Sequence, residues 1–405
     1  MKVEIKDIEE ARNSISSTII KTDLTYSRSC SEWVGIPTYI KHENMQLTGS
    51  FKIRGALNKL LSLHANGEKS TVIAASAGNH AQGVALSASK VGLKSIIVMP
   101  QITPIVKIQA TKSYGAEIIL QGDMFDQSYQ YARQLEKEKG YVFIHPFEDE
   151  KVIAGQGTIG LEILEQLPDV DSVIVAIGGG GLISGISTAI KSKKPNCKVY
   201  GVVSSVFPHM RDVYKHQDLT VQTAYTTIAD GIAVKNPSPV MYEKFISKYV
   251  DDIAAIDDDE VAKAIVFLLE RTKTVAEGSG AITLAAAARA KKLGWDLGKK
   301  TCVVICGGNI DMKQVAKVID KGLKASGRTA RFSILSEDRP GLLQKVTNVI
   351  AQHGGNIIEI YHDRAGGGIK FSEVIVDIVV ETKGFDHIQI IKEGLLSLNL
   401  RVEVD

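Results

Sequence analysis

The chain has 405 residues, of which 44% are hydrophobic and 23% charged, so it can bury the cores of two or three globular domains. Lysine and arginine together number 48 against 46 acidic residues, which gives no electrostatic support for binding to nucleic acid or to an anionic membrane. We therefore expect its partners to be small molecules or further copies of the chain.

The start of the chain and its cysteines favour a cytoplasmic protein. The charged segment MKVEIKDIEEARNSI lacks the apolar run of a signal peptide, and no stretch of about 18 apolar residues follows it. The four cysteines, Cys30, Cys197, Cys302 and Cys306, match neither a disulfide framework nor a zinc-binding spacing. We expect a cytoplasmic protein that binds no metal.

Short apolar runs alternate with amphipathic stretches from about residue 70 to 310. The pattern predicts helices at 81–92, 106–115 and 125–140, and strands within 71–76, 95–100, 116–122, 172–181 and 301–309. Apolar strands that alternate with helices are typical of a doubly wound, mostly parallel α/β sheet covered on both faces. Ligands of such sheets bind at the carboxyl ends of the strands, where the glycine-rich segments of this chain fall.

The last 75 or so residues have a different pattern. Residues 321–329 are small, polar and basic, which is typical of a linker. Beyond them the order of elements is strand, helix, strand, strand, helix, strand, and this predicts a βαββαβ ferredoxin-like domain over 330–405.

A turn of four glycines follows the apolar run that begins at residue 172. In Gly178–Gly181 several backbone N–H groups can converge, and the helix that follows adds its positive end, so the turn could bind a phosphate. The segment has neither a Walker lysine nor the dinucleotide-binding spacing. The alternative is a plain tight turn between strand and helix.

Lys52 has unusual neighbours for a lysine. Residues 48–55, TGSFKIRG, surround it with glycines, hydroxyl groups and an aromatic residue, a composition that predicts a loop. Most lysines are simply exposed on the surface, and that is the alternative here. Together with a phosphate-binding turn, however, a lysine beside an aromatic side chain indicates pyridoxal phosphate, whose aldehyde forms a Schiff base with lysine.

Five segments resemble the threonine/serine dehydratase family, which are pyridoxal-phosphate enzymes of the tryptophan-synthase-β class. They are ENMQLTGSFKIRGA (43–56), SAGNHAQGVA (76–85), GGGGLISG (178–185), ADGIAV (229–234) and CGGNID (306–311). The tail, with SEDRPGLL (336–343) and GGNI (354–357), resembles an amino-acid-binding ACT domain. The resemblance implies a two-lobed catalytic domain over 1–320, with a smaller lobe at about 45–150, followed by a linker at 321–329 and an ACT domain at 330–405.

The resemblance also implies a set of cofactor-binding residues. Lys52 would hold the cofactor and later act as the base on the substrate Cα. Phe51 and Gly231 would lie on opposite faces of the ring, Asn79 would bond to its 3′-oxygen, and Cys306 would face its nitrogen. The phosphate would be bound by Gly178, Gly179, Gly180, Gly181 and Leu182.

The substrate carboxylate would be held by the backbone of Ser76, Ala77, Gly78, Asn79 and His80. Three of the implied roles have simpler alternatives. His80 could fill the start of a helix, Asn79 could be an ordinary N-cap, and Phe51 could belong to the core.

Two departures from the family favour β-elimination. Cys306 replaces a serine, and a thiol is a weak donor to the ring nitrogen, so the ring would be a poor electron sink. Related serine racemases have a second serine where this chain has Ala77, so racemisation is not expected. Relatives that bind a structural cation have glutamate at the position of Ser205, so the sequence leaves open whether a cation is bound there.

The resemblance implies that L-threonine is converted to 2-oxobutanoate and ammonia, and L-serine to pyruvate. A regulatory amino acid would bind between the tails of two chains, around Asp338, Gly354 and Asn356, so we expect a homo-oligomer, a dimer or a tetramer. The alternative for the tail is a purely structural dimerisation module.

Other functions remain open on the same architecture. They are a serine racemase, a β-replacement synthase, and an amino-acid sensor without activity. The sequence leaves open the preference for threonine or serine, the identity of the effector, and the choice between isoleucine biosynthesis and amino-acid breakdown.

Overall fold

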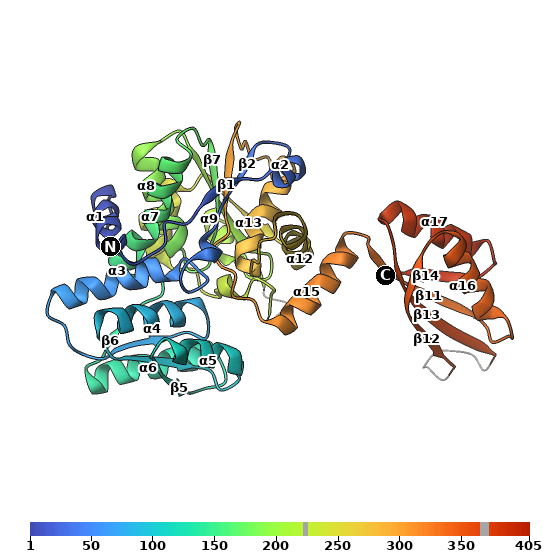
Figure 1. Cartoon of the computed structure of the whole chain (residues 1–405), viewed down its shortest axis with the longest axis horizontal. Helices are drawn as coiled ribbons and strands as arrows, with labels where there is room; N and C mark the ends of the chain where they lie inside the picture. Colours follow the sequence, from blue (N-terminus) through green and yellow to red (C-terminus); the bar gives the residue numbers. More distant parts are fainter. Residues whose placement is uncertain (222–225, 365–371) are drawn as a thin grey trace. The chain divides into compact units, whose positions relative to one another are not determined.

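The computed structural model describes residues 1–221, 226–364 and 372–405 (Figure 1). These residues form two compact units, residues 1–314 and residues 315–405. None of the helices in the described ranges is both long and apolar enough to cross a membrane.

The larger lobe of the first unit is built on a six-stranded sheet in the order β1-β2-β10-β7-β8-β9. The first two strands pair antiparallel and the other neighbours are parallel. Every residue of β7 and β10 is buried, which explains why these strands read as unbroken apolar runs. The strands are β1 (Leu24–Tyr26), β2 (Thr38–Lys41), β7 (Ser172–Ala176), β8 (Lys198–Ser204), β9 (Asp252–Ile256) and β10 (Thr301–Val304).

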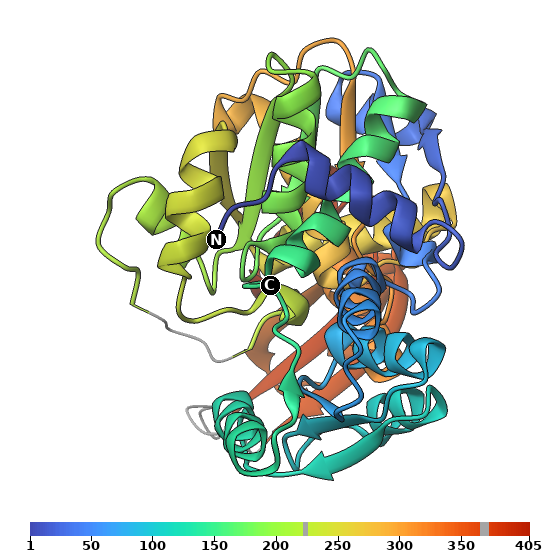
Figure 2. The same cartoon turned by 90° about the vertical axis from the view of Figure 1, so that its left-hand side faces the viewer.

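Helices cover both faces of this sheet (Figures 1 and 2). The longer ones are α1 (Ile5–Ile15), α2 (Arg28–Val34), α7 (Glu150–Gln166), α8 (Gly181–Lys193), α12 (Asp258–Phe267) and α13 (Gly278–Ala288). The short ones are α9 (His209–Tyr214), α10 (Pro239–Met241), α11 (Ser247–Tyr249) and α14 (Ala290–Leu293).

The smaller lobe is a parallel sheet in the order β5-β4-β3-β6 with its own helices. Its strands are β3 (Val72–Ala75), β4 (Ser95–Met99), β5 (Glu117–Leu120) and β6 (Val142–Phe143), and its helices are α4 (Asn79–Val91), α5 (Ile105–Ser113) and α6 (Phe125–Lys139). Helix α3 (Lys52–Ala65) packs against α4 of this lobe and against α7 of the larger one (Figure 1). The predicted parallel α/β architecture is confirmed.

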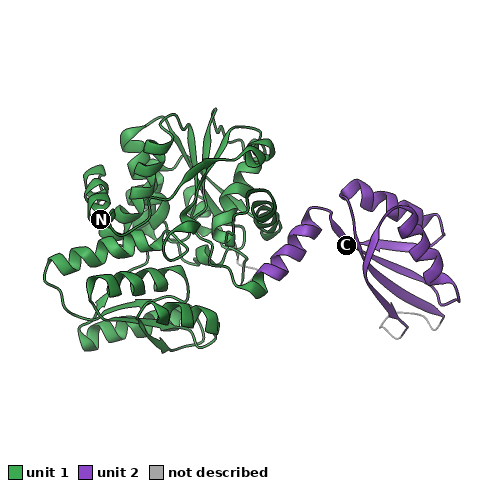
Figure 3. Ribbon diagram, viewed as in Figure 1, with its two compact units in different colours: residues 1–314 green, residues 315–405 purple. Residues whose placement is uncertain are grey.

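The second unit contains the predicted βαββαβ fold (Figure 3). Its antiparallel sheet has the order β12-β13-β11-β14, and Val346, Ile350, Ile391 and Leu395 of its two helices share one buried core with the sheet. The elements are β11 (Thr329–Glu337), α16 (Leu342–Gln352), β12 (Asn356–Asp363), β13 (Glu373–Glu381), α17 (Phe385–Leu396) and β14 (Arg401–Val404).

The segment expected as a linker, 321–329, starts inside a helix. Helix α15 (Met312–Ala325) continues through its first five residues, and β11 begins at Thr329. The apolar residues Val315, Val318, Ile319 and Leu323 recur with helical spacing. The small and basic residues around Leu323 favoured a linker and masked this helical pattern. Residues 321–325 are therefore helical, and only residues 326–328 lie between the helix and β11.

Candidate active site

Lys52 is the first residue of helix α3 and does not lie in a loop as its neighbours suggested. Its Nζ donates a hydrogen bond to the carbonyl oxygen of Pro146 at 3.2 Å and lies 5.3 Å from the centre of the Phe51 ring. Burial of the amine lowers the pKa of Lys52 to about 8. A larger fraction of this amine is therefore neutral near pH 7 than for an exposed lysine.

The loop prediction failed because Gly55 serves helix packing: a Cβ on this glycine would lie 2.6 Å from the carbonyl oxygen of Val152 in α7. A Cβ on Gly155 of α7 would lie 2.5 Å from the carbonyl oxygen of Arg54. A Cβ on Gly83 of α4 would lie 3.1 Å from the carbonyl carbon of Lys52. Both neighbouring helices thus approach the backbone of α3 more closely than a side chain would allow.

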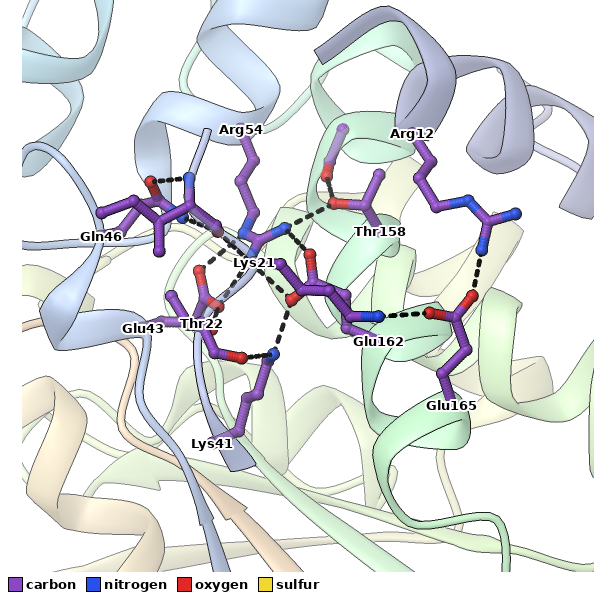
Figure 4. A network of polar contacts seen from close by, with 12 residues as sticks. Arg12, Lys21, Thr22, Lys41, Glu43, Gln46, Arg54, Thr158, Glu162 and Glu165 are labelled. Carbon is purple, nitrogen blue, oxygen red and sulfur yellow. Dashed lines mark hydrogen bonds and ion pairs between the residues drawn. The ribbon is translucent and has the colours of Figure 1, made fainter. Parts of the chain in front are cut away.

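A buried ionic network fixes the first turn of α3 (Figure 4). Arg54 Nε lies 2.7 Å from Glu43 Oε2, and Arg54 Nη1 lies 2.6 Å from Glu162 Oε1 of α7. Lys41 Nζ at the end of β2 also contacts Glu162, at 2.6 Å. Burial alone would lower the pKa of Arg54, but the two carboxylates outweigh it and raise this pKa. The two cations and two anions balance, and they anchor α3 two residues after Lys52.

The glycine turn lies between β7 and α8. Gly180 has a φ of +95° and is the N-cap of α8, and no side chain of the described residues caps this helix start. A Cβ on Gly179 would lie 2.1 Å from the Phe147 ring, and one on Gly181 would lie 2.9 Å from Phe147 Cβ. The backbone N–H groups at the start of α8 are therefore available to an anion.

The segment between β6 and α7 connects the parts of this site. The carbonyl oxygen of Ile144 lies 2.9 Å from Nε2 of His80, Pro146 contacts Lys52, and Phe147 packs on the glycine turn. Burial lowers the pKa of His80 to about 3, so its ring is neutral and Nε2 carries the donated hydrogen. The buried His80 side chain thus links the start of α4 to the segment between β6 and α7.

Cys306, Phe51 and Gly231 come together around Ser279, the second residue of α13. The Cys306 thiol donates to the carbonyl oxygen of Ser279 at 3.1 Å, and the Phe51 N–H donates to the Cys306 carbonyl oxygen at 3.1 Å. A Cβ on Gly231 would lie 2.6 Å from Ser279 Oγ. Burial, together with the nearby Glu277 carboxylate, raises the pKa of Cys306 well above its usual range, so the sulfur remains a thiol.

Asn79 is the first residue of α4, and Gly78 takes the N-cap position that was the simpler interpretation of Asn79. The Nδ2 group of Asn79 donates a hydrogen bond to Oε1 of Glu277 at 2.8 Å. Burial, with Asp230 nearby, raises the pKa of Glu277 to about 7. Sequence reasoning missed Glu277; its one signal was an isolated acidic residue among small residues in AEGSGA (276–281).

The expected carboxylate-binding segment, Ser76–His80, joins β3 to α4. Ser76 Oγ accepts a hydrogen bond from the N–H of Gly78 at 3.2 Å, and no side chain within the described ranges caps α4. This turn repeats the arrangement of the glycine turn, with an open helix start at the end of a parallel strand.

The three residues expected to bind an effector do not meet within one chain. Glu337, next to Asp338, pairs with Glu373 at one end of β13, and Asn356 pairs with Glu381 at the other end. Eight residue steps along a strand span about 27 Å. A site that uses Asp338 together with Gly354 and Asn356 therefore requires two chains.

The described residues contain no group of three or more His, Cys, Asp or Glu side chains placed to hold a metal ion. Ser205, at the position where relatives bind a cation, is exposed. The amine of Lys52, the open helix start at the glycine turn and the buried Cys306 instead fit a cofactor with an aldehyde, a phosphate and a ring nitrogen.

Comparison with known proteins agrees with this geometry. Residues 15–307 match the family model described as pyridoxal-phosphate dependent enzyme, and residues 330–389 match the ACT domain. An L-threonine ammonia-lyase of Thermotoga maritima is 43% identical over 402 residues, which cover 99% of each chain. The catabolic L-threonine dehydratase of Escherichia coli is 44% identical over 318 residues, 78% of this chain and 96% of that enzyme.

Solved structures give the same result. Maize serine racemase superposes with a TM-score of 0.74 at 32% identity, covering 80% of this chain and 99% of that one. The processed form of threonine deaminase isoform 2 from Solanum lycopersicum has a TM-score of 0.73 at 32% identity, covering 79% of this chain and 90% of that one. The chain therefore belongs to the pyridoxal-phosphate-dependent enzymes and carries an ACT domain at its carboxyl end.

Proposed function

We propose that this enzyme is a threonine ammonia-lyase, which converts L-threonine to 2-oxobutanoate and ammonia and also L-serine to pyruvate. The observation that carries the proposal is the partly neutral amine of Lys52, with a pKa lowered to about 8, in the same site as the uncapped glycine turn. The names of the similar enzymes from Thermotoga maritima and Escherichia coli support threonine as the substrate.

The cofactor would be held as follows. Lys52 would bond to it covalently, the N–H groups of Gly178–Leu182 would bind its phosphate, and Phe51 and Gly231 would enclose its ring. Asn79 would donate to the ring oxygen, and Cys306 would face the ring nitrogen. When bound, the cofactor supplies an electron sink for the pair of electrons left at the substrate Cα.

The protein's own groups would then direct the reaction. The N–H groups at the start of α4 would orient the substrate carboxylate, and Lys52 Nζ would take the proton from Cα, for which its lowered pKa is suited. The Cys306 thiol has one hydrogen, which it donates to the Ser279 carbonyl oxygen, and a thiol would be a weak donor to the ring nitrogen, so charge at Cα would be poorly stabilised and early loss of the β-hydroxyl would be favoured. Ala77 has no proton to deliver on the opposite face, which favours elimination over racemisation.

We further propose that the ACT domain binds an amino-acid effector between two copies of the chain. Asp338 of one copy would act with Gly354 and Asn356 of another, because one chain holds them at opposite ends of its sheet. The enzyme would accordingly be a homo-oligomer, a dimer or a tetramer.

Product analysis tests the reaction. The purified protein with pyridoxal phosphate is given L-threonine or L-serine, alone and with a thiol, and ammonia, 2-oxoacids, D-amino acids and thioethers are measured. We expect ammonia and the 2-oxoacid in equal amounts. A thioether product would indicate a β-replacement synthase, a D-amino acid a racemase, and no product at all a sensor.

Lys52→Ala should abolish turnover. The matched control is Lys59→Ala, two turns further along α3, where Lys59 forms an ion pair with Asp149, the N-cap residue of α7. The proposal fails if Lys52→Ala retains the activity of the control.

A further inference from the structure

Glu277 is a buried carboxylate to which the proposed reaction gives no task. It is the N-cap residue of α13, yet its side chain caps no N–H of that helix in the part of the chain described. Instead Oε1 accepts two hydrogen bonds, from Asn79 Nδ2 at 2.8 Å and from Ser279 Oγ at 2.7 Å. With 5% of its surface exposed, Glu277 bears the desolvation cost of a buried carboxyl group, so these contacts call for an explanation.

The contacts of Glu277 continue through Asn79 to the other side of the site. Asn79 Oδ1 accepts from Asn309 Nδ2 at 2.8 Å, and the same Nδ2 donates to the carbonyl oxygen of Thr48 at 2.7 Å. Asn79 belongs to α4 of the smaller lobe, whereas Glu277 precedes α13 of the larger one. The chain of hydrogen bonds therefore crosses between the lobes.

Both ends of this series of hydrogen bonds, the Thr48 carbonyl oxygen and Oε1 of Glu277, accept hydrogen bonds. The Thr48 carbonyl oxygen can only accept, so the group that Asn309 directs to it must be its NH₂. The same Asn309 NH₂ donates to Asn79, so Asn79 must present its oxygen to Asn309 and its own NH₂ to Oε1 of Glu277. This removes the usual twofold ambiguity of an amide side chain. One of the two hydrogens on Asn79 Nδ2 is used by Glu277, and one remains.

We propose that Glu277 is a positioning residue that holds the Asn79 amide with its second N–H directed at the ring oxygen of the cofactor. This inference rests on the proposed role of Asn79. If the Asn79 side-chain amide rotated by 180°, its oxygen would face the anionic ring oxygen of the cofactor. The two hydrogen-bond acceptors would repel each other. Glu277 opposes this rotation because it would place the amide oxygen against Oε1, an acceptor that already receives a hydrogen bond from Ser279.

The test compares Glu277→Met with Glu277→Gln. Methionine is similar in size and removes the acceptor and the buried charge, so folding should be preserved, and a thermal melt checks this. Glutamine loses the charge but keeps an oxygen for Asn79. Cofactor affinity is measured by titrating cofactor-free protein with pyridoxal phosphate, and the visible absorbance spectrum of the bound cofactor is recorded. Neither readout depends on turnover.

We expect Glu277→Met to weaken cofactor binding roughly tenfold and to change the visible spectrum, the effect of losing the one hydrogen bond that orients Asn79. Glu277→Gln should restore both to near the wild-type values. In an Asn79→Ala background, Glu277→Met should have no further effect, because its action passes through Asn79. Asn309→Leu, which removes the donor at the other end, should shift the spectrum in the same direction as Glu277→Met.

Two results would overturn this role. One is a Glu277→Met protein whose affinity and spectrum match the wild type. The other is an effect of Glu277→Met that persists in full without Asn79. A wild-type protein that shows no visible cofactor band at all would instead overturn the proposed function, so the two failures are distinguishable.

Discussion

The Phe147 ring packs so closely on Gly179 that a Cβ at this glycine would lie 2.1 Å from a ring carbon. No real Cβ contact is this short, so any side chain at residue 179 must push the ring away. Phe147 follows Pro146, whose carbonyl oxygen accepts a hydrogen bond from Lys52. The glycine turn and the lysine are therefore linked through one short segment.

Gly179→Ala should weaken cofactor binding by at least about tenfold, because displacing Phe147 disturbs the proposed phosphate site and the Lys52 contact together. Titration of the cofactor-free protein measures this. The double variant Gly179→Ala with Phe147→Ala has room for the new methyl group and should regain part of the loss. Equal affinity of wild type and Gly179→Ala would show that the turn does not hold the phosphate.

Arg54→Met should destabilise the first unit by about 3–5 kcal/mol, since it leaves Glu43 buried without its cation and Glu162 with Lys41 alone. Urea unfolding followed by tryptophan fluorescence measures this for the first unit, because both tryptophans, Trp33 and Trp295, belong to it. The matched control is Arg28→Met, which removes an exposed pair with Glu32 and should cost less than about 0.5 kcal/mol. Similar losses in both variants would contradict an anchoring role for the network.

The contribution of His80 to the stability of the protein should fall as the pH drops below about 6.5, whereas Glu277, with its raised pKa, contributes with the opposite sign. Burial lowers the pKa of His80 to about 3, from an ordinary value of 6.5, so between these values the unfolded chain binds a proton that the folded chain does not. This one group can cost up to about 1.4 kcal/mol per pH unit. Burial also lowers the pKa of His145, to about 4, and adds a contribution of the same sign.

His80→Gln can keep a donor for the Ile144 carbonyl but does not titrate. Its free energy of unfolding, from urea melts at pH 7, 6 and 5, should therefore decline less steeply than that of the wild type. Identical slopes would show that His80 takes up its proton in the folded state as readily as in the unfolded state.

A chain ending at Ala325 should retain turnover of L-threonine and lose any response to amino-acid effectors such as isoleucine or valine. The related Escherichia coli enzyme supports this, because its match to 318 residues already covers 96% of it. In the full chain, Asp338→Ala should remove the response while leaving basal turnover unchanged. Steady-state rates of L-threonine turnover, measured with and without each effector, test both variants. A truncated enzyme that still responds to an effector would place the effector site in the first unit.

Much of the fold follows from periodicity in the sequence. The fully buried strands β7 and β10 read as unbroken apolar runs, whereas β13, with one face on the ACT core, alternates buried and half-buried residues. Glycine-rich turns after apolar strands predict a ligand site at the carboxyl ends of the strands. These are local signals, so a single sequence carries them.

The polar contacts of the site could not be predicted in this way. Glu277 is 198 residues from Asn79, and Arg54 is 108 residues from Glu162, and no periodicity relates such pairs. The same limit explains the error at Lys52, where Gly55, which lets α7 approach α3, resembled a glycine of a loop. Only the packed fold distinguishes a close helix contact from a flexible turn.

Covalent labelling of Lys52 decides whether the enzyme works as proposed. The protein is incubated with pyridoxal phosphate, reduced with borohydride, digested and analysed by mass spectrometry. We expect the phosphopyridoxyl group on Lys52 in the wild type and in Lys59→Ala, and no specific labelling in Lys52→Ala. Stoichiometric labelling of another lysine, with Lys52 unmodified, would contradict the assignment of this site.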